Sequence, residues 1–189
     1  MYLKRNKELD VLLLFLGDYR REYYLREISE KAHVPLKTTQ TILSALEREK
    51  ILKAKQYGKN KYFSLNLENV ETKYHLEHAE LYKTHLFLQK YPLFKTFLKN
   101  LKTQSIIILF GSFAKGTATK ESDCDLLTIS DKKEELPSHL LPYKIHNIQM
   151  TTESYTKAQN ETLIKEVEEH HVIFNNHSLY INMRWWKCG

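Results

Sequence analysis

The sequence predicts an α+β protein built from three helices and a hairpin, a connecting helix, and a small mixed sheet. Apolar residues recur at helical spacing through the first third of the chain. Two short strand-like runs then enclose the turn residues 57–60. Further on, one aliphatic run (106–110) leads into a Gly-Ser pair, and another (126–129) follows an Asp-x-Asp pair. The predicted domains are residues 1–68 (helices and hairpin), 69–100 (helical connector) and 101–189 (mixed sheet).

Apolar spacing and one proline mark the helices of the first domain. The apolar run within residues 7–16 predicts a buried first helix, because a helix apolar on most sides packs in a core or against a partner. Leu25, Ile28 and Ala32 repeat at helical spacing and predict a second helix. Pro35 breaks that pattern and suits the first turn of a third helix over residues 36–49.

The third helix has a core face and a polar face. Thr39, Ile42, Leu43 and Leu46 form the core stripe. The polar face carries side chains of the kinds that contact base edges and phosphates in a major groove. With two lysines of the hairpin, the candidate DNA contacts are Lys37, Gln40, Thr41, Ser44, Arg48, Lys59 and Lys61.

Charge supports this interpretation. Residues 37–61 hold seven Lys or Arg against two Glu, a net charge of +5, while the whole chain carries +6. A local basic patch of this kind is typical of proteins that bind the phosphate backbone. A basic face that is simply solvated, on a domain used for packing or dimerisation, is the alternative.

Three helices followed by a hairpin resemble the winged helix-turn-helix of bacterial and archaeal transcription regulators. The resemblance is carried by Leu25–Ala32 (LREISEKA) for the first motif helix, by residues 46–52 at the end of the reading helix, and by residues 57–66 for the wing. It implies double-stranded DNA as a partner. It also implies a homodimer, because such regulators usually bind two half-sites.

A helix over residues 70–90 is expected to join the two domains. Val70, Tyr74, Leu81 and Leu88 form one apolar stripe on it. Such a stripe can pack the domains together or pair with its copy in a dimer, and the sequence leaves both open.

The second domain carries the most informative spacing, because ten residues separate Gly111-Ser112 from Asp123-x-Asp125. Glycine at a strand end lets the backbone turn sharply and approach a ligand closely. A helix that follows would point free N–H groups at an anion such as a triphosphate. The two aspartates lie at i and i+2, so their carboxylates share one face of a strand and repel unless a cation intervenes. Mg²⁺ held by carboxylates and substrate phosphates meets that need.

This segment resembles the signature of the polymerase-beta-like nucleotidyltransferase superfamily, which includes kanamycin nucleotidyltransferase and the minimal nucleotidyltransferases. The resemblance implies that Gly111 and Ser112 hold the triphosphate of an NTP, with ATP the expected nucleotide, and that Asp123 and Asp125 bind Mg²⁺ as catalytic residues. Lys115 and Lys120 are candidate phosphate contacts.

The pattern departs from that family at the third acidic residue that active members usually carry on a later strand. The next predicted strand, residues 143–151, contains no acid, and Asn147 or Gln149 falls where the acid is expected. Amides are weaker metal ligands and cannot act as bases. Glu153 lies just beyond the strand, and bending back would make it the third catalytic carboxylate.

The last fifty residues predict a helix over residues 152–169 and a closing hairpin. The hairpin would pair residues 172–174 with residues 179–181 across Asn175-Asn176.

Three functions fit these observations. The leading one is a DNA-binding protein that transfers a nucleoside monophosphate from an NTP to an acceptor hydroxyl. The second is a non-catalytic transcription regulator whose second domain senses a nucleotide or supports dimerisation, which the missing acid favours. The third, implied by the minimal nucleotidyltransferases, is a toxin–antitoxin component. Two cysteines and the absence of a signal peptide or membrane span lead us to expect a reducing, cytoplasmic location.

Overall fold

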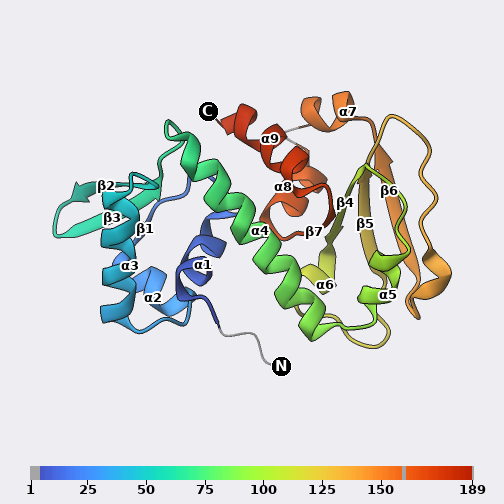
Figure 1. Cartoon of the computed structure of the whole chain (residues 1–189), viewed down its shortest axis with the longest axis horizontal. Coiled ribbons are helices and arrows are strands. Elements are labelled where there is room, and N and C mark those ends of the chain that lie inside the picture. Colours follow the sequence, from blue (N-terminus) through green and yellow to red (C-terminus); the bar gives the residue numbers. More distant parts are fainter. Residues whose placement is uncertain (1–4, 159–160, 189) are drawn as a thin grey trace. The chain divides into compact units, whose positions relative to one another are not determined.

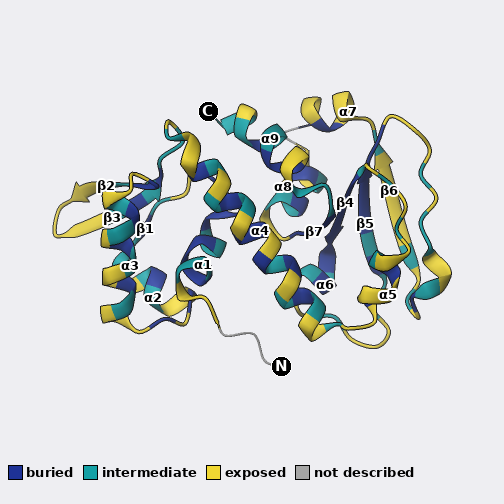
Figure 2. Ribbon diagram, viewed as in Figure 1, coloured by how far each residue is buried: buried dark blue, intermediate teal, exposed yellow. Residues whose placement is uncertain are grey.

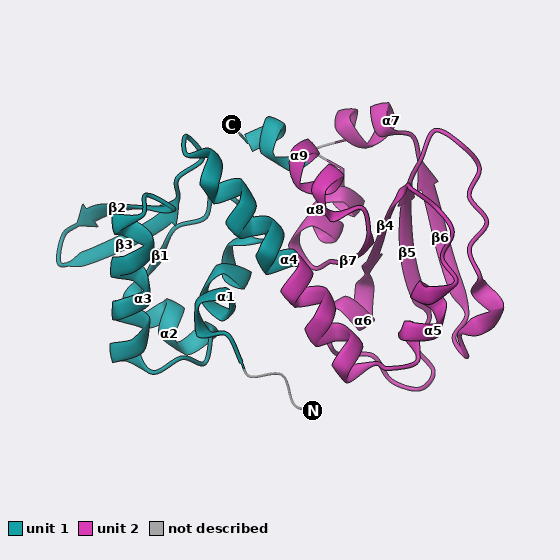
Figure 3. Ribbon diagram, viewed as in Figure 1, with its two compact units in different colours: residues 1–80, 184–189 teal, residues 81–183 magenta. Residues whose placement is uncertain are grey.

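A computed structural model describes residues 5–158 and 161–188 of the chain. It divides into two compact units, Met1–Glu80 with Arg184–Gly189, and Leu81–Met183 (Figure 3). The division falls inside helix α4 (Val70–Lys90), whose bounds agree with the predicted connecting helix. The domain boundary expected after residue 68 lies just ahead of that helix.

The first unit contains the three helices and the hairpin that the sequence predicts. Its elements are α1 (Lys7–Leu12), a 3₁₀ turn η1 (Leu13–Phe15), β1 (Tyr23–Tyr24), α2 (Leu25–Lys31), α3 (Leu36–Arg48), β2 (Leu52–Tyr57) and β3 (Asn60–Leu65). The short strand β1 is an addition, and it makes a three-stranded antiparallel sheet in the order β1-β3-β2. Gly58 has a φ of +57° in the hairpin turn, a conformation that glycine adopts without strain.

The core stripe of α3 explains its position in this unit. Thr39, Leu43 and Leu46 are buried, and the Thr39 hydroxyl donates to the Val34 carbonyl (3.1 Å) just ahead of the helix. The opposite face, from Lys37 to Arg48, is exposed as predicted (Figure 2). The amphipathic division of α3 therefore leaves a polar surface beside the hairpin.

The second unit is built around a mixed four-stranded sheet in the order β6-β5-β4-β7 (Figure 1). The strands are β4 (Ile106–Phe110), β5 (Cys124–Ile129), β6 (Ile145–Met150) and β7 (Val172–Asn175). The helices are α5 (Phe94–Lys99), α6 (Gly111–Lys115), α7 (Thr152–Lys157), α8 (Thr162–Glu169) and α9 (His177–Cys188), with a 3₁₀ turn η2 (Ser138–Leu140). Strands β5 and β6 are parallel, and the other two pairs are antiparallel, so the predicted mixed sheet is confirmed.

Alternation along the strands gives the sheet two apolar faces. Cys124 and Leu126 of β5 belong to one buried cluster, with Phe94 and Phe113. Leu127 and Ile129 belong to the other, which α8 covers with Ile164 and Val167. Because successive side chains point to opposite faces, Asp125 shares the α8 side of the sheet with Leu127 and Ile129. The edge strand β6 is mostly exposed, whereas β4 is buried throughout (Figure 2).

Two predictions for the C-terminal part are wrong. The helix expected over residues 152–169 is divided into α7 and α8, because Glu161 is extended (ψ 142°) and starts α8 as its N-cap; residues 159 and 160 lie outside the described part of the chain. The closing hairpin has only its first arm, β7. Asn176 turns the chain with a φ of +59°, and residues 179–181 belong to α9.

No helix in residues 5–158 and 161–188 is long and apolar enough to cross a lipid bilayer.

Candidate functional site

The Gly-Ser turn and the second aspartate meet at one end of the sheet. Gly111 follows β4 with a φ of +67° and starts α6, and Ser112 is the second residue of that helix. A Cβ atom on Gly111 would lie 2.3 Å from Asp125 Oδ2, so the carboxylate packs directly against the glycine backbone. Only a residue without a side chain allows this approach, which explains the glycine at this position.

The two aspartates share this end because β5 begins there. Asp123 immediately precedes the strand and Asp125 is its second residue, so both side chains lie on the face opposite Cys124. The Asp123 and Asp125 side chains are about 40% and 31% exposed, which leaves them accessible to a ligand. Cys124 is buried, and burial followed by the charge of Asp125 raises the pKa of its thiol to about 12. The thiol therefore stays protonated and does not act as a ligand.

His146 of β6 stands between the two carboxylates. Its Nε2 lies 3.7 Å from Asp123 Oδ2, and its Nδ1 lies 3.6 Å from Asp125 Oδ1. The parallel register pairs Asp125 with His146, and paired residues of adjacent strands point to the same face. The histidine thus occupies the position across from the Asp-x-Asp pair.

The amides expected at this position lie elsewhere. Asn147 accepts a hydrogen bond from Thr128 Oγ1 (2.8 Å) on the other face of the sheet. Gln149 donates to the Lys132 carbonyl (2.6 Å) and so fixes the β5–β6 connection. The prediction missed His146 because a shift of one residue exchanges the faces of a strand, and the register was not known from the sequence.

The structure does not bring Glu153 to the aspartates. Asp125 and His146 lie at the start of the parallel strands, whereas Glu153 follows the far end of β6 on α7. Its carboxylate is 75% exposed and pairs with Lys157. Glu153 therefore cannot supply the third carboxylate in this arrangement.

A different glutamate approaches the site from α8. Burial raises the pKa of Asp125, and His146 opposes this shift. The charges of Asp123 and Glu166 raise the pKa further, so Glu166 lies near enough to act on Asp125. Glu166 Oε1 also accepts from Lys115 Nζ at 2.6 Å, which ties α8 to the end of α6. The sequence held no signal for this contact, because 51 residues separate the two partners.

Two further lysines lie around the Gly-Ser helix. Lys90 Nζ donates to the Gly116 carbonyl (3.0 Å), where α6 ends in a left-handed glycine. Lys120 lies exposed in the turn between α6 and β5, where the Thr119 N–H donates to Ser122 Oγ (2.9 Å). Of the predicted phosphate contacts, Lys115 is held beside the site, and Lys120 stands on the loop that leads to it.

The donor set fits Mg²⁺ bound jointly by protein and phosphate. Within the described ranges, no three His, Cys, Asp or Glu side chains converge as a complete metal cage. Mg²⁺ commonly takes one or two carboxylates and completes its shell with water and substrate phosphates. Burial is the main cause of the raised pKa of Asp125, and the charge of Asp123 adds to it. A cation placed between the two carboxylates would relieve their mutual repulsion.

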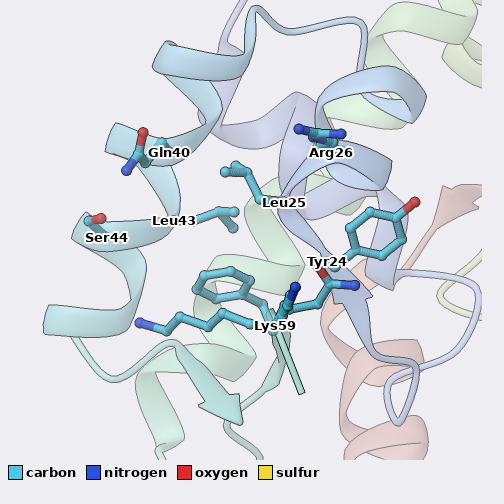
Figure 4. A pocket seen from close by; sticks show the side chains of 10 residues that line it. Tyr24, Leu25, Arg26, Gln40, Leu43, Ser44 and Lys59 are labelled. Carbon is cyan, nitrogen blue, oxygen red and sulfur yellow. The ribbon is translucent and has the colours of Figure 1, made fainter. Parts of the chain in front are cut away.

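The first unit holds a separate cavity of about 660 Å³ between α3, the hairpin and the start of α2 (Figure 4). Leu25 and Leu43 form part of its apolar floor, and Gln40 and Ser44 line it from α3. Its cations are Arg26, Lys59 and Lys61, and no acidic residue lines it. The cavity therefore suits an anion, and Arg26, which lines it, was not among the candidate DNA contacts named from the sequence.

The side chains predicted to contact DNA differ in their exposure and in their ion pairs. Lys61 Nζ pairs with Glu47 of α3 at 2.6 Å, which fixes the hairpin on the helix and offsets one charge. Arg48 lies 3.8 Å from Glu49 and remains 78% exposed. Lys37 and Lys59 are exposed and form no ion pair within 4.0 Å in the part of the chain that is described. Gln40, Thr41 and Ser44 are exposed on the same face of α3.

Comparison with known proteins agrees with the geometry of the second unit. Residues 92–179 match the family model described as a nucleotidyltransferase domain. No curated protein and no solved structure matches the chain significantly. The matched segment includes the Gly-Ser turn, both aspartates, His146 and Glu166. The chain thus contains a nucleotidyltransferase domain, which spans residues 92–179.

Proposed function

We propose that the second unit binds an NTP with Mg²⁺ and transfers its nucleoside monophosphate to an acceptor hydroxyl. The observation that carries this is the packing of the Asp125 carboxylate against Gly111 at the start of α6. It places a metal ligand directly beside a turn suited to phosphate. The nucleotidyltransferase domain found over residues 92–179 supports the same reaction class.

In this proposal each side chain of the site has its own role in the reaction. Asp123 and Asp125 hold the ion, and Ser112 with the first N–H groups of α6 binds the triphosphate. Mg²⁺, when bound, neutralises charge on the attacking and leaving oxygens. The acceptor oxygen forms a bond to the α-phosphorus as the bond to the bridging oxygen breaks, and pyrophosphate leaves. The imidazole of His146 can take the proton of the acceptor hydroxyl, a role that a side-chain amide cannot fill.

The presence of His146 at this position also supports a second function, in which the domain binds a nucleotide without catalysing transfer. The side chain that adjoins Asp123 and Asp125 is the imidazole of His146 rather than a third carboxylate, and two carboxylates hold divalent ions less firmly than three. A domain of this kind can bind a nucleotide without rapid turnover. In that case the second unit acts as a nucleotide sensor for the first.

Incubation with labelled NTPs and a panel of acceptor hydroxyls separates the two functions. Transfer by the wild type, lost in Asp123→Asn, is the result expected of the enzyme. Nucleotide binding by the wild type without transfer identifies the sensor instead. Transfer that survives in Asp123→Asn contradicts the assignment of the metal site.

We also propose that the first unit binds double-stranded DNA as a winged helix-turn-helix, with α3 in the major groove and the β2–β3 hairpin as the wing. The exposed donors along α3 and the cavity lined by Arg26, Lys59 and Lys61 support this. In this proposal the sugar–phosphate backbone passes along the cavity while Gln40 and Ser44 face the bases. A second copy of the chain would supply the other half-site.

Titration of labelled duplex DNA at several salt concentrations tests this proposal. Arg26→Ala should weaken binding to all duplex sequences alike and flatten the salt dependence, because it removes one phosphate contact. Arg20→Ala is the matched control, since Arg20 lies outside the cavity and its guanidinium donates to the Cys188 carbonyl (3.2 Å). Equal effects of the two substitutions would rule out the cavity as the DNA site.

A further inference from the structure

The Lys115–Glu166 pair joins the Gly-Ser helix to α8, and α6 itself packs against β5, the strand that carries Asp125. Lys115 is the last residue of α6, and Gly116 then ends the helix with a φ of +74°. The distance of 2.6 Å between Nζ and Oε1 is that of a charge-assisted hydrogen bond. Both side chains are about 40% exposed, at 38% and 42%, so a ligand can reach them.

Glu166 stands on a helix that is packed against the sheet. Ile164 and Val167, its neighbours on α8, are fully buried against the sheet. The face of the sheet that α8 covers is the one that carries Leu127 and Ile129, and Asp125 extends that face toward the site. The carboxylate of Glu166 therefore stands on a packed element, whereas the four-carbon side chain of lysine has many conformations of its own.

Glu166 does not complete the metal site as a third carboxylate in this structure. It does not converge with Asp123 and Asp125 into a three-ligand cluster among the described residues. Its oxygen is instead engaged by the Lys115 ammonium. Besides its charge effect on Asp125, the contact that Glu166 makes at the site is therefore the one with the lysine.

We propose that Glu166 is a positioning residue that holds the Lys115 ammonium toward the phosphates of the bound nucleotide. The inference rests on the proposed nucleotide site. A lysine without a partner loses side-chain conformational entropy when it contacts a phosphate. The ion pair with Glu166 already orders Lys115 before the ligand binds, so most of this entropy cost no longer falls on binding. The pair is thus a phosphate clamp assembled from two elements that are distant in sequence.

Binding of inorganic tripolyphosphate with Mg²⁺, measured by calorimetry on the full chain, tests the proposal. The probe lacks a base, so its affinity reports the phosphate contacts alone. Glu166→Ala should weaken binding roughly tenfold, because Lys115 must then be ordered by the ligand. Glu166→Gln should keep most of the affinity, since its amide oxygen still accepts from Nζ. Lys115→Ala should weaken binding at least as much as Glu166→Ala, because it removes the phosphate contact itself, and the double variant should be no weaker than Lys115→Ala.

The sign of the effect distinguishes positioning from simple electrostatics. Removing a carboxylate near an anion site tightens anion binding if charge alone matters, so a tighter Glu166→Ala variant would overturn the proposal. The proposal would also be overturned if Glu166→Ala reduced tripolyphosphate affinity as much in the Lys115→Ala variant as in the wild type. Glu166 would then act on the ligand without the lysine. Glu169→Ala removes an exposed carboxylate from the same helix and should leave the affinity unchanged. A wild type that binds neither ATP nor tripolyphosphate refutes the proposed function itself, and with it the clamp.

Discussion

Gly111→Ala is the sharpest perturbation of the proposed nucleotide site. The substitution adds one methyl group at the point where the Gly-Ser turn and the start of β5 touch. That methyl group would lie 2.3 Å from Asp125 Oδ2, a distance that real Cβ atoms essentially never show, and 3.2 Å from its Cγ, which is tighter than most real Cβ contacts. The Asp125 carboxylate or the Gly-Ser turn must therefore move.

The expected change in stability combines a backbone cost, a smaller compensating gain and a steric cost. A left-handed φ costs a non-glycine residue about 1–2 kcal/mol. Fewer unfolded conformations of alanine return about 0.4–1 kcal/mol. The steric displacement of Asp125 comes on top, so we expect a net loss of about 1–3 kcal/mol in the free energy of unfolding. If Asp125 is the metal ligand that we propose, its displacement should also weaken Mg²⁺-ATP binding at least tenfold, or about 1.4 kcal/mol.

Gly58→Ala is a matched control within the same chain. Gly58 also has a positive φ, +57°, but a Cβ there meets no atom within 4 Å. The change in the free energy of unfolding that Gly58→Ala causes therefore measures the conformational cost alone. Subtracting it from the change caused by Gly111→Ala leaves the cost of the steric contact with Asp125. Urea unfolding of both variants and calorimetric titration with Mg²⁺-ATP supply the measurements, and the Gly58 variant should bind nucleotide as the wild type does.

Equal destabilisation by the two substitutions would refute the close packing of Gly111 and Asp125. Unchanged nucleotide affinity in a folded Gly111→Ala variant would show that this end of the sheet is not the nucleotide site.

Three other predictions follow from individual contacts. His146→Asp places a third carboxylate opposite Asp125, so the variant should be less stable without metal and gain more stability from Mg²⁺ in thermal melts, whereas His146→Asn should not. Lys59→Ala should lower the salt slope of duplex binding by about 1, and Lys61→Ala by less because Glu47 already offsets its charge; equal slopes would contradict this. Glu134 has its pKa lowered from the ordinary 4.5, chiefly by a hydrogen bond from Ser105, so its stabilisation is present above about pH 4.5 and is lost as the pH falls through the lowered value. Glu134→Gln should therefore make the acid-induced loss of stability shallower in urea titrations at pH 6 and pH 3, and an unchanged pH dependence would contradict it.

Local patterns in the sequence were sufficient for the main elements. Of the predicted core stripe of α3, Thr39, Leu43 and Leu46 are buried and Ile42 is half-buried, and α4 has the predicted bounds. Strand β4 and the helix after Gly111 also lie where the sequence placed them. These elements depend on near-neighbour periodicity and turn chemistry, which a single sequence contains.

The C-terminal errors show where local patterns mislead. Leu179, Tyr180 and Ile181 fit a strand as a short apolar run, but a short run cannot by itself distinguish a strand from a buried helix. In the structure Tyr180, Ile181 and Arg184 are buried on one side of α9. Packing of that side decides the element, and packing is not visible in a run of three residues.

The sequence by itself determined that a Gly-Ser turn and two aspartates lie at the ends of adjacent strands. The connection between Ser112 and Asp123 is only ten residues long, which favours pairing of the strands that it joins. Only the tertiary structure decided which residues join them. The register of β6 brings His146 rather than Asn147 or Gln149 to the aspartates, and the packing of α8 brings Glu166 to Lys115 across 51 residues. Register and helix docking depend on the whole buried surface of the unit, so no local pattern around His146 or Glu166 specifies their place.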